Sequence, residues 1–185
     1  MVSRTLVIID NFLGNPDEMR ELALKQTYVK MGSAGKRSTQ QFHRLIPPAE
    51  FGRLLDITVE DWNRYPINGR FQICTAEDPL VFHADAQRWA GVIFLTPDAP
   101  VECGLTLVRS RATGARRSTG NAATDALTFD GKLLDSTKWE TIDRIGNVYN
   151  RLVLWDAQHI HAAASYFGTD LRDGRLFWMF FFDGA

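Results

Sequence analysis

The apolar positions of the chain have helical spacing in its first third and strand-like spacing in the remainder. A short apolar run at residues 5–9 predicts a buried strand. Residues 16–28 carry apolar side chains at helical intervals behind Asn15, a residue type that favours a helix N-terminus. A second apolar stripe begins at Pro48 and predicts a helix that ends near Arg64.

Beyond residue 69 the apolar residues come in short β-branched or aromatic runs that turn clusters divide, a pattern typical of strands. These runs are residues 70–75, 80–82, 91–95, 105–108, 151–155 and 176–182. Helices followed by many short strands favour a helix-buttressed β-sandwich or barrel over alternating βαβ units. We therefore predict one mainly β (α+β) domain over residues 1–185. Residues 1–69 would form a support of one strand and two helices, and residues 70–185 the β core.

Two polar segments interrupt this pattern. Residues 32–39 read as a flexible connection, either a plain linker or a mobile loop near the active site. Residues 110–147 are rich in Gly, Ser, Thr, Arg and Asp, with one weakly helical piece at 133–142. A polar excursion of this length inside a β domain predicts a loop or lid insertion.

Composition narrows the class of protein. The 185 residues carry a net charge of −1, which gives no general attraction to nucleic acid or anionic membranes. The two cysteines lack CxxC spacing, so neither a disulfide framework nor a zinc knuckle is indicated. No run approaches the roughly 20 apolar residues of a membrane span, and the first apolar run is too short for a secretory signal. We expect a cytoplasmic protein.

A histidine and a carboxylate stand at the entrance of an apolar run. His83 and Asp85 are separated by one residue, and a strand places such side chains on one face. A second histidine would complete the facial triad of non-haem Fe(II) oxygenases, which leaves coordination positions open. By spacing alone, His159 and His161 both qualify. A His-x-Asp sequence also arises by chance, as an edge histidine beside an acid in a turn.

The order of these motifs resembles the 2-oxoglutarate/Fe(II) dioxygenase superfamily, and most closely its prolyl-4-hydroxylase-like branch. The resemblance rests on the opening VIIDNFLGNPDEMRELAL, the His83-x-Asp85 pair, Gly104 at a strand start, a distal histidine and Arg175 on the last strand. It implies a double-stranded β-helix (jelly-roll, cupin-like) core. It also implies that His83, Asp85 and His161 bind Fe(II), because an apolar residue precedes His161 and small residues follow it.

The resemblance further implies that a basic residue of the last strand binds the distal carboxylate of 2-oxoglutarate. Arg175 fits, because a guanidinium grips a carboxylate with two hydrogen bonds. Strand alternation also predicts that it shares one inward face of the last strand with residues 177, 179 and 181. Arg172 is its rival, in the polar turn before that strand. The tyrosines that often help to hold the cosubstrate just before the His-x-Asp strand are absent, with Ile73 and Leu80 near those positions. Gln72, Thr106 and Tyr149 are the candidates to take part instead.

The implied activity is hydroxylation or desaturation of a C–H bond in a small metabolite, an amino acid or a peptide side chain, with O₂ as the oxidant. Candidate substrate contacts are Trp89, Arg109, Arg111 and His159. Two other classes stay open: a cupin-like iron enzyme that does not use 2-oxoglutarate, and a non-catalytic β-helix module that binds a metal or ligand. No feature of the sequence indicates an oligomeric state.

Overall fold

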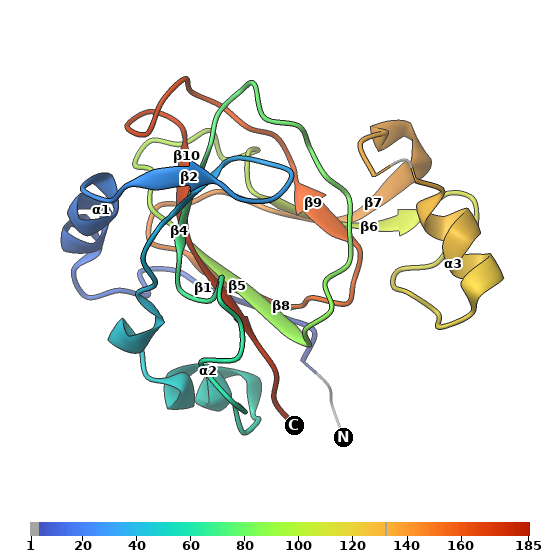
Figure 1. Ribbon diagram of the computed structural model, residues 1–185, viewed down its shortest axis with the longest axis horizontal. Coiled ribbons are helices and arrows are strands. Elements are labelled where there is room, and N and C mark those ends of the chain that lie inside the picture. The colour runs from blue at the N-terminus through green and yellow to red at the C-terminus, as the bar shows by residue number, and fades with distance from the viewer. Residues whose placement is uncertain (1–3, 132) are drawn as a thin grey trace.

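Two antiparallel sheets stack against each other in the computed structural model, which describes residues 4–131 and 133–185 (Figure 1). The predicted support and the predicted insertion each include positions outside this part, residues 1–3 and residue 132. The larger sheet has the order β1 (Leu6–Ile9), β8 (Leu152–Asp156), β5 (Trp89–Phe94), β10 (Arg175–Phe182), β4 (Phe71–Cys74), β3 (Lys36–Ser38) and β2 (Tyr28–Lys30). The smaller sheet has the order β7 (Trp139–Ile145), β6 (Leu105–Ser110) and β9 (His161–Ala163). The mainly β fold class that the sequence predicts is confirmed.

Both faces of four strands of the larger sheet, β8, β5, β10 and β4, are buried, which explains why these strands are nearly continuous apolar runs. In β10, Trp178 and Phe180 belong to an apolar cluster on the outer face, together with side chains of the helices. Phe177 and Met179 point the other way and belong to a second cluster between the two sheets. Arg175 lines a cavity on this inner side as well. The alternation that the sequence predicts for the last strand is therefore confirmed.

Helices cover the outer face of the larger sheet (Figure 1). They are α1 (Pro16–Leu24), a 3₁₀ turn (His43–Leu45) and α2 (Pro48–Leu55). Phe51 of α2 is fully buried, and its ring centroid lies 4.9 Å from that of Phe180 and 5.3 Å from that of Trp62. The prediction of two supporting helices is confirmed.

Both helices end before their predicted boundaries, because the segments after them pair elsewhere. The residues after α1 form β2, whose aromatic and β-branched residues pair with β3. α2 ends well before Arg64, since Asp56 adopts a left-handed conformation (φ 61°). The N–H of Thr58 then donates to the carbonyl oxygen of Ala185 at 2.8 Å. Tertiary pairing with the C-terminus replaces the third helical turn that the apolar stripe suggests.

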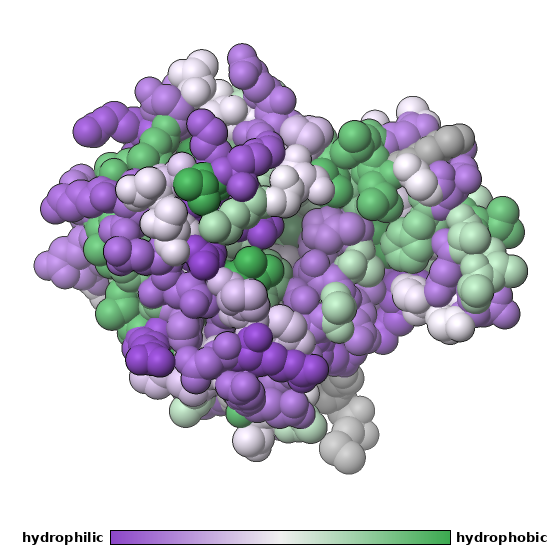
Figure 2. All heavy atoms as spheres, in the orientation of Figure 1, coloured by the Kyte–Doolittle hydropathy of each residue, from purple (hydrophilic) through white to green (hydrophobic). Residues whose placement is uncertain are grey.

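The predicted insertion, residues 110–147, contains regular structure. It holds α3 (Ala122–Phe129), a 3₁₀ turn (Ser136–Lys138) and β7, which pairs with β6. The helical piece expected at 133–142 is wrong, because β7 begins at Trp139. Figure 2 shows apolar surface gathered around α3, where Leu127 and Leu134 are exposed. None of the described helices is long and apolar enough to cross a membrane.

We expect Phe51→Ala to lower the free energy of unfolding by about 3–5 kcal/mol, because it leaves a cavity between α2 and the larger sheet. Urea unfolding followed by circular dichroism measures this loss. Leu45→Ala is the control, since Leu45 is 55% exposed and its truncation should cost less than about 0.5 kcal/mol. A loss below about 1 kcal/mol for Phe51→Ala would contradict this account of the outer face.

Candidate metal centre and adjoining cavity

Two reciprocal backbone hydrogen bonds bring a pair of histidines together. The N–H of His83 donates to the carbonyl oxygen of His161 at 3.0 Å, and the N–H of His161 donates back at 2.8 Å. His161 opens β9, whereas His83 forms an isolated bridge. The strand predicted at residues 80–82 is therefore wrong. Two residues on, the N–H of Asp85 donates to the carbonyl oxygen of Ala157 at 2.8 Å, which holds Asp85 beside the corner that leads to β9.

The side chains of His83, Asp85 and His161 converge on one point. One potential ligand atom from each lies within 4.8 Å of the other two. The carboxylate stands between the rings, with Oδ1 3.5 Å from Nε2 of His83 and Oδ2 3.5 Å from Nε2 of His161. This is the two-histidine, one-carboxylate set of the facial triad.

Backbone carbonyls fix both imidazole rings. Nδ1 of His83 lies 3.0 Å from the carbonyl oxygen of Val81, and Nδ1 of His161 lies 2.8 Å from that of His159. A carbonyl oxygen only accepts, so each Nδ1 must carry the proton. Each Nε2 then presents its lone pair to the point of convergence, as a metal ligand does.

The electrostatics around these three side chains favour a bound cation. Burial raises the pKa of Asp85, while His83, Gln87 and Arg37 act against that shift. Oδ2 of Asp85 is buried and has no hydrogen-bond partner among the described residues. Burial, assisted by His83, lowers the pKa of His161 to about 3, so this ring is neutral at pH 7. Two imidazole nitrogens and one carboxylate thus face a common point, a set of donor atoms that fits a divalent metal ion.

A cavity of about 370 Å³ adjoins the three residues. Arg175 lies in its wall and is only 3% exposed. Its Nε donates to the carbonyl oxygen of Cys103 at 3.0 Å, and one Nη to that of Gly104 at 3.2 Å. A Cβ on Gly104 would lie 1.8 Å from the carbonyl oxygen of Ile145, so only glycine lets this strand start approach so closely.

The charge of Arg175 has no carboxylate partner among the described residues. The guanidinium lies against aromatic rings, with its central carbon 4.5 Å from the ring centroid of Phe177 and 5.2 Å from that of Phe94. Burial lowers the pKa of Arg175, and the groups that oppose this shift are Tyr166 and the two cysteines. A buried cation without a counter-charge is costly, so the cavity suits an anionic ligand.

Sequence reasoning missed two residues of this cavity, Arg37 and Tyr166. Tyr166 lies in the turn between β9 and β10, and its ring centroid is 5.8 Å from the central carbon of Arg175. A tyrosine in that turn was a usable signal, because the segment just before His83 has none. Arg37 lies in the segment read as a flexible connection. That segment contains the tip of the β2–β3 hairpin and β3, and it lines the cavity, so it is not a plain linker.

Of the three residues expected to help hold the cosubstrate, one lines the cavity. Gln72 of β4 does. Thr106 is buried on β6 and donates to the carbonyl oxygen of Asp143 at 3.3 Å. Tyr149 donates to Oδ1 of Asp17 at 2.6 Å. Neither of the latter two is among the residues of the cavity wall, so the structure does not support a cosubstrate contact for them.

The four candidate substrate contacts lie outside the cavity wall. Trp89 is 3% exposed and belongs to the outer-face cluster, because β5 points it toward the helices. Arg109 pairs with Glu140 at 2.8 Å on the exposed side of β6, and Arg111 is exposed just beyond that strand. His159 has Nε2 2.8 Å from an Nη of Arg117. Its carbonyl oxygen orients the ring of His161, and His159 does not line the cavity.

No family model and no curated protein matches the sequence. Solved structures do match the fold. HygX from Streptomyces hygroscopicus, with nickel, 2-oxoglutarate and hygromycin B bound, has a TM-score of 0.57 at 11% identity and covers 98% of this chain and 83% of its own. A prolyl hydroxylase from Trichoplax adhaerens, in complex with a peptide fragment, has a TM-score of 0.52 at 12% identity over 97% of this chain and 84% of its own. The Fe(II)/α-ketoglutarate-dependent dioxygenase TqaL has a TM-score of 0.51 at 10% identity over 97% and 83%. Identities this low show the fold alone, and the double-stranded β-helix prediction is confirmed.

We expect Asp85→Asn to stabilise the metal-free protein at pH 7 by about 1–2 kcal/mol, because it removes a buried carboxylate oxygen without a partner. Because burial raises the pKa of Asp85, folding favours its protonated form. That stability is complete below the unfolded pKa of about 3.9 and is lost as pH rises through the folded pKa. The advantage of the variant should therefore grow from pH 3 to pH 7.

Thermal unfolding in chelator across this pH range measures the effect. Asp78→Asn is the matched control. Despite partial burial, backbone hydrogen bonds from Thr75 and Gly35 lower the pKa of Asp78, so its replacement should destabilise the protein at pH 7. Added Zn(II) should stabilise the wild type and leave Asp85→Asn nearly unchanged. A stabilising response to Zn(II) of equal size in that variant would place the metal elsewhere.

Proposed function

We propose that this protein is an Fe(II)- and 2-oxoglutarate-dependent oxygenase that hydroxylates or desaturates a C–H bond. One observation carries the proposal: a single cavity adjoins three converging electron-pair donors and also contains a buried arginine without a counter-charge. A metal ion satisfies the first need, and a dicarboxylate that reaches from that metal to the arginine satisfies the second. The fold shared with HygX, whose structure holds nickel and 2-oxoglutarate, supports the same assignment.

The residues have separate tasks. His83, Asp85 and His161 would hold Fe(II), which when bound supplies the redox chemistry for O₂. Arg175 would hold the distal carboxylate of 2-oxoglutarate through the end of its guanidinium that does not face Cys103 and Gly104. In a hydroxylation the substrate R–H, O₂ and 2-oxoglutarate give R–OH, succinate and CO₂. One oxygen atom enters each of the first two products.

Other side chains would shape the cosubstrate site. Tyr166 adjoins the guanidinium of Arg175 and hydrogen-bonds the thiol of Cys74. We propose that its hydroxyl takes the place of the tyrosines that are missing before His83. Phe177 and Met179 form an apolar wall beside this polar end and exclude water from it.

The substrate would be a small molecule, an amino acid or a side chain of a peptide. The structure of HygX has hygromycin B bound and that of the Trichoplax protein has a peptide bound, so this fold admits both kinds of ligand. The carboxylate of Asp85 favours hydroxylation or desaturation over halogenation. In the superfamily that the sequence resembles, halogenation goes with a small residue at this position. We place the protein in the cytoplasm on the composition of its sequence.

We expect Arg175→Gln to raise the Kd for 2-oxoglutarate at least about a hundredfold, since it removes the charged partner of a buried carboxylate. Anaerobic titration with Fe(II) and then 2-oxoglutarate measures this through the visible charge-transfer band of the chelated metal. Iron affinity should stay unchanged. His161→Ala should abolish the band altogether. Arg172→Gln is the matched control, because Arg172 lies exposed in the turn before β10 and should be silent.

The outcomes separate the alternatives. Unchanged 2-oxoglutarate affinity in Arg175→Gln would remove the role assigned to that residue. Iron binding without any band in the wild type would overturn the proposed cosubstrate, and iron-dependent turnover without succinate would indicate a cupin-like enzyme. A wild-type protein that binds no iron would be a β-helix fold without this chemistry.

A further inference from the structure

A second arginine faces the same cavity from the β2–β3 hairpin. Arg37 is the middle residue of β3 and pairs with Gln72 of β4. Its side chain lines the cavity together with His83, Asp85 and Arg175. It is partly buried, and burial lowers its pKa. The proposed function assigns no task to this guanidinium.

Hydrogen bonds orient the side chain of Arg37. Its Nε donates to Oε1 of Gln72 at 2.9 Å. The amide nitrogen of Gln72 in turn donates to the carbonyl oxygen of Ala34 at 3.2 Å and lies 3.3 Å from the sulfur of Cys74. Among the residues that the structure describes, neither Nη of Arg37 has an acceptor, and no carboxylate forms an ion pair with it. The two-pronged end of the guanidinium is therefore fixed in direction and available.

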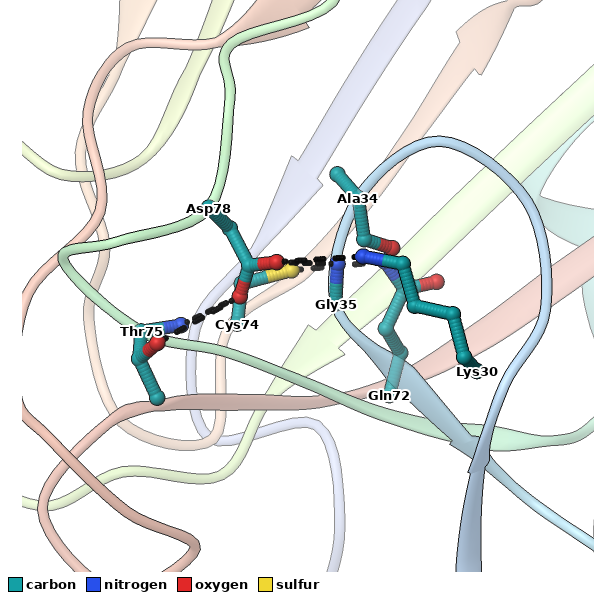
Figure 3. A network of polar contacts seen from close by, with 7 residues as sticks. All are labelled: Lys30, Ala34, Gly35, Gln72, Cys74, Thr75 and Asp78. Carbon is teal, nitrogen blue, oxygen red and sulfur yellow. Dashed lines mark hydrogen bonds and ion pairs between the residues drawn. The ribbon is translucent and has the colours of Figure 1, made fainter.

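The hairpin that carries Arg37 is clamped to the larger sheet. Figure 3 shows Asp78, just beyond β4, reaching the hairpin tip. Its Oδ1 accepts the N–H of Gly35 at 2.8 Å and lies 3.6 Å from Nζ of Lys30, while Oδ2 accepts the N–H of Thr75 at 2.9 Å. Gly35 has φ +66°, and a Cβ there would lie 2.3 Å from the carbonyl oxygen of Ile73. The hairpin tip is therefore held in close contact with β4, so Arg37 has a defined position in the cavity wall.

Charge balance indicates what Arg37 would bind. A divalent metal and Arg175 carry three positive charges, and Asp85 and a 2-oxoglutarate dianion carry three negative ones. The positive charge of Arg37 is not neutralised by any of these groups. We propose that Arg37 binds a carboxylate group of the primary substrate, which makes that substrate a small carboxylic acid such as an amino acid. This inference rests on the proposed function, and it assigns the two arginines to different molecules.

A carboxylate fits better than a phosphate dianion. A second negative charge would need a second cation beside Arg37. Lys30 is engaged with Asp78, and Lys36 is exposed and does not line the cavity. A planar carboxylate with one charge matches one guanidinium fork.

The test uses the whole protein loaded with Zn(II) and saturating 2-oxoglutarate, so that no turnover occurs and Arg175 is occupied. Straight-chain monocarboxylates from acetate to hexanoate, their matched amides and inorganic phosphate are titrated while the Nε–H resonance of Arg37 is followed by NMR. We expect at least one monocarboxylate to shift this resonance with a Kd of about a millimolar. Its amide should bind at least tenfold more weakly.

Two variants complete the test. Arg37→Gln should weaken carboxylate binding at least tenfold and leave the Kd for 2-oxoglutarate within twofold of the wild type. Lys36→Gln is the matched control, because it removes the same charge from the same strand outside the cavity wall, and it should change neither constant. The comparison of acid with amide in the wild type needs no variant and stands even if Arg37→Gln folds poorly.

Failures of the two proposals are distinguishable. If the wild type does not bind 2-oxoglutarate in the loading step, the proposed function is overturned. Normal loading without carboxylate binding overturns the role of Arg37 alone. Tighter binding of phosphate than of any monocarboxylate overturns the assigned substrate class. A tenfold loss of 2-oxoglutarate affinity in Arg37→Gln would assign this arginine to the cosubstrate instead.

Discussion

The reciprocal hydrogen bonds between the backbones of His83 and His161 are the contact on which the candidate site depends. They join the segment that leads into β5 of the larger sheet to the edge of the smaller one. Both histidines then use the carbonyl oxygen two residues earlier in the chain to orient Nδ1. The two rings are thus held by the same local geometry on either side of one bridge, and the carboxylate of Asp85 enters between them. Backbone pairing thus brings together the three side chains that we propose as metal ligands.

Such a site costs stability, and the fold compensates for that cost on its other side. The inner face of β10 carries the buried, unpaired charge of Arg175. Its outer face carries Trp178 and Phe180, which pack with α2 in a cluster that contains no part of the cavity. Because the two faces of β10 are separate, the outer cluster can supply packing energy while Arg175 on the inner face lines the cavity. This arrangement agrees with the general opposition between stability and function at buried charged sites.

Local periodicity in the sequence was enough to predict the residues that share a strand face. The alternation after Arg175 placed it on the inner side of β10, and the spacing of His83 and Asp85 was compatible with convergence. Trp89 could not be placed this way, because every residue of β5 is buried and no polar alternation shows which face points to the cavity. Arg37 was missed for another reason. Its strand is three residues long and polar, and it exists only through pairing with β2 and β4.

Gln72 lies between the two arginines in the sheet, because its strand β4 pairs with β3, which carries Arg37, and with β10, which carries Arg175. Its backbone pairs with Arg37 on one side and with Phe177 of β10 on the other, and its amide holds Nε of Arg37. β10, which carries Arg175, and β3, which carries Arg37, are therefore the two neighbours of one central strand. The spacing of the two guanidiniums is therefore set by the pairing of β3, β4 and β10. A cavity of this kind can sort two anions by position, one that bridges to the metal and one that does not.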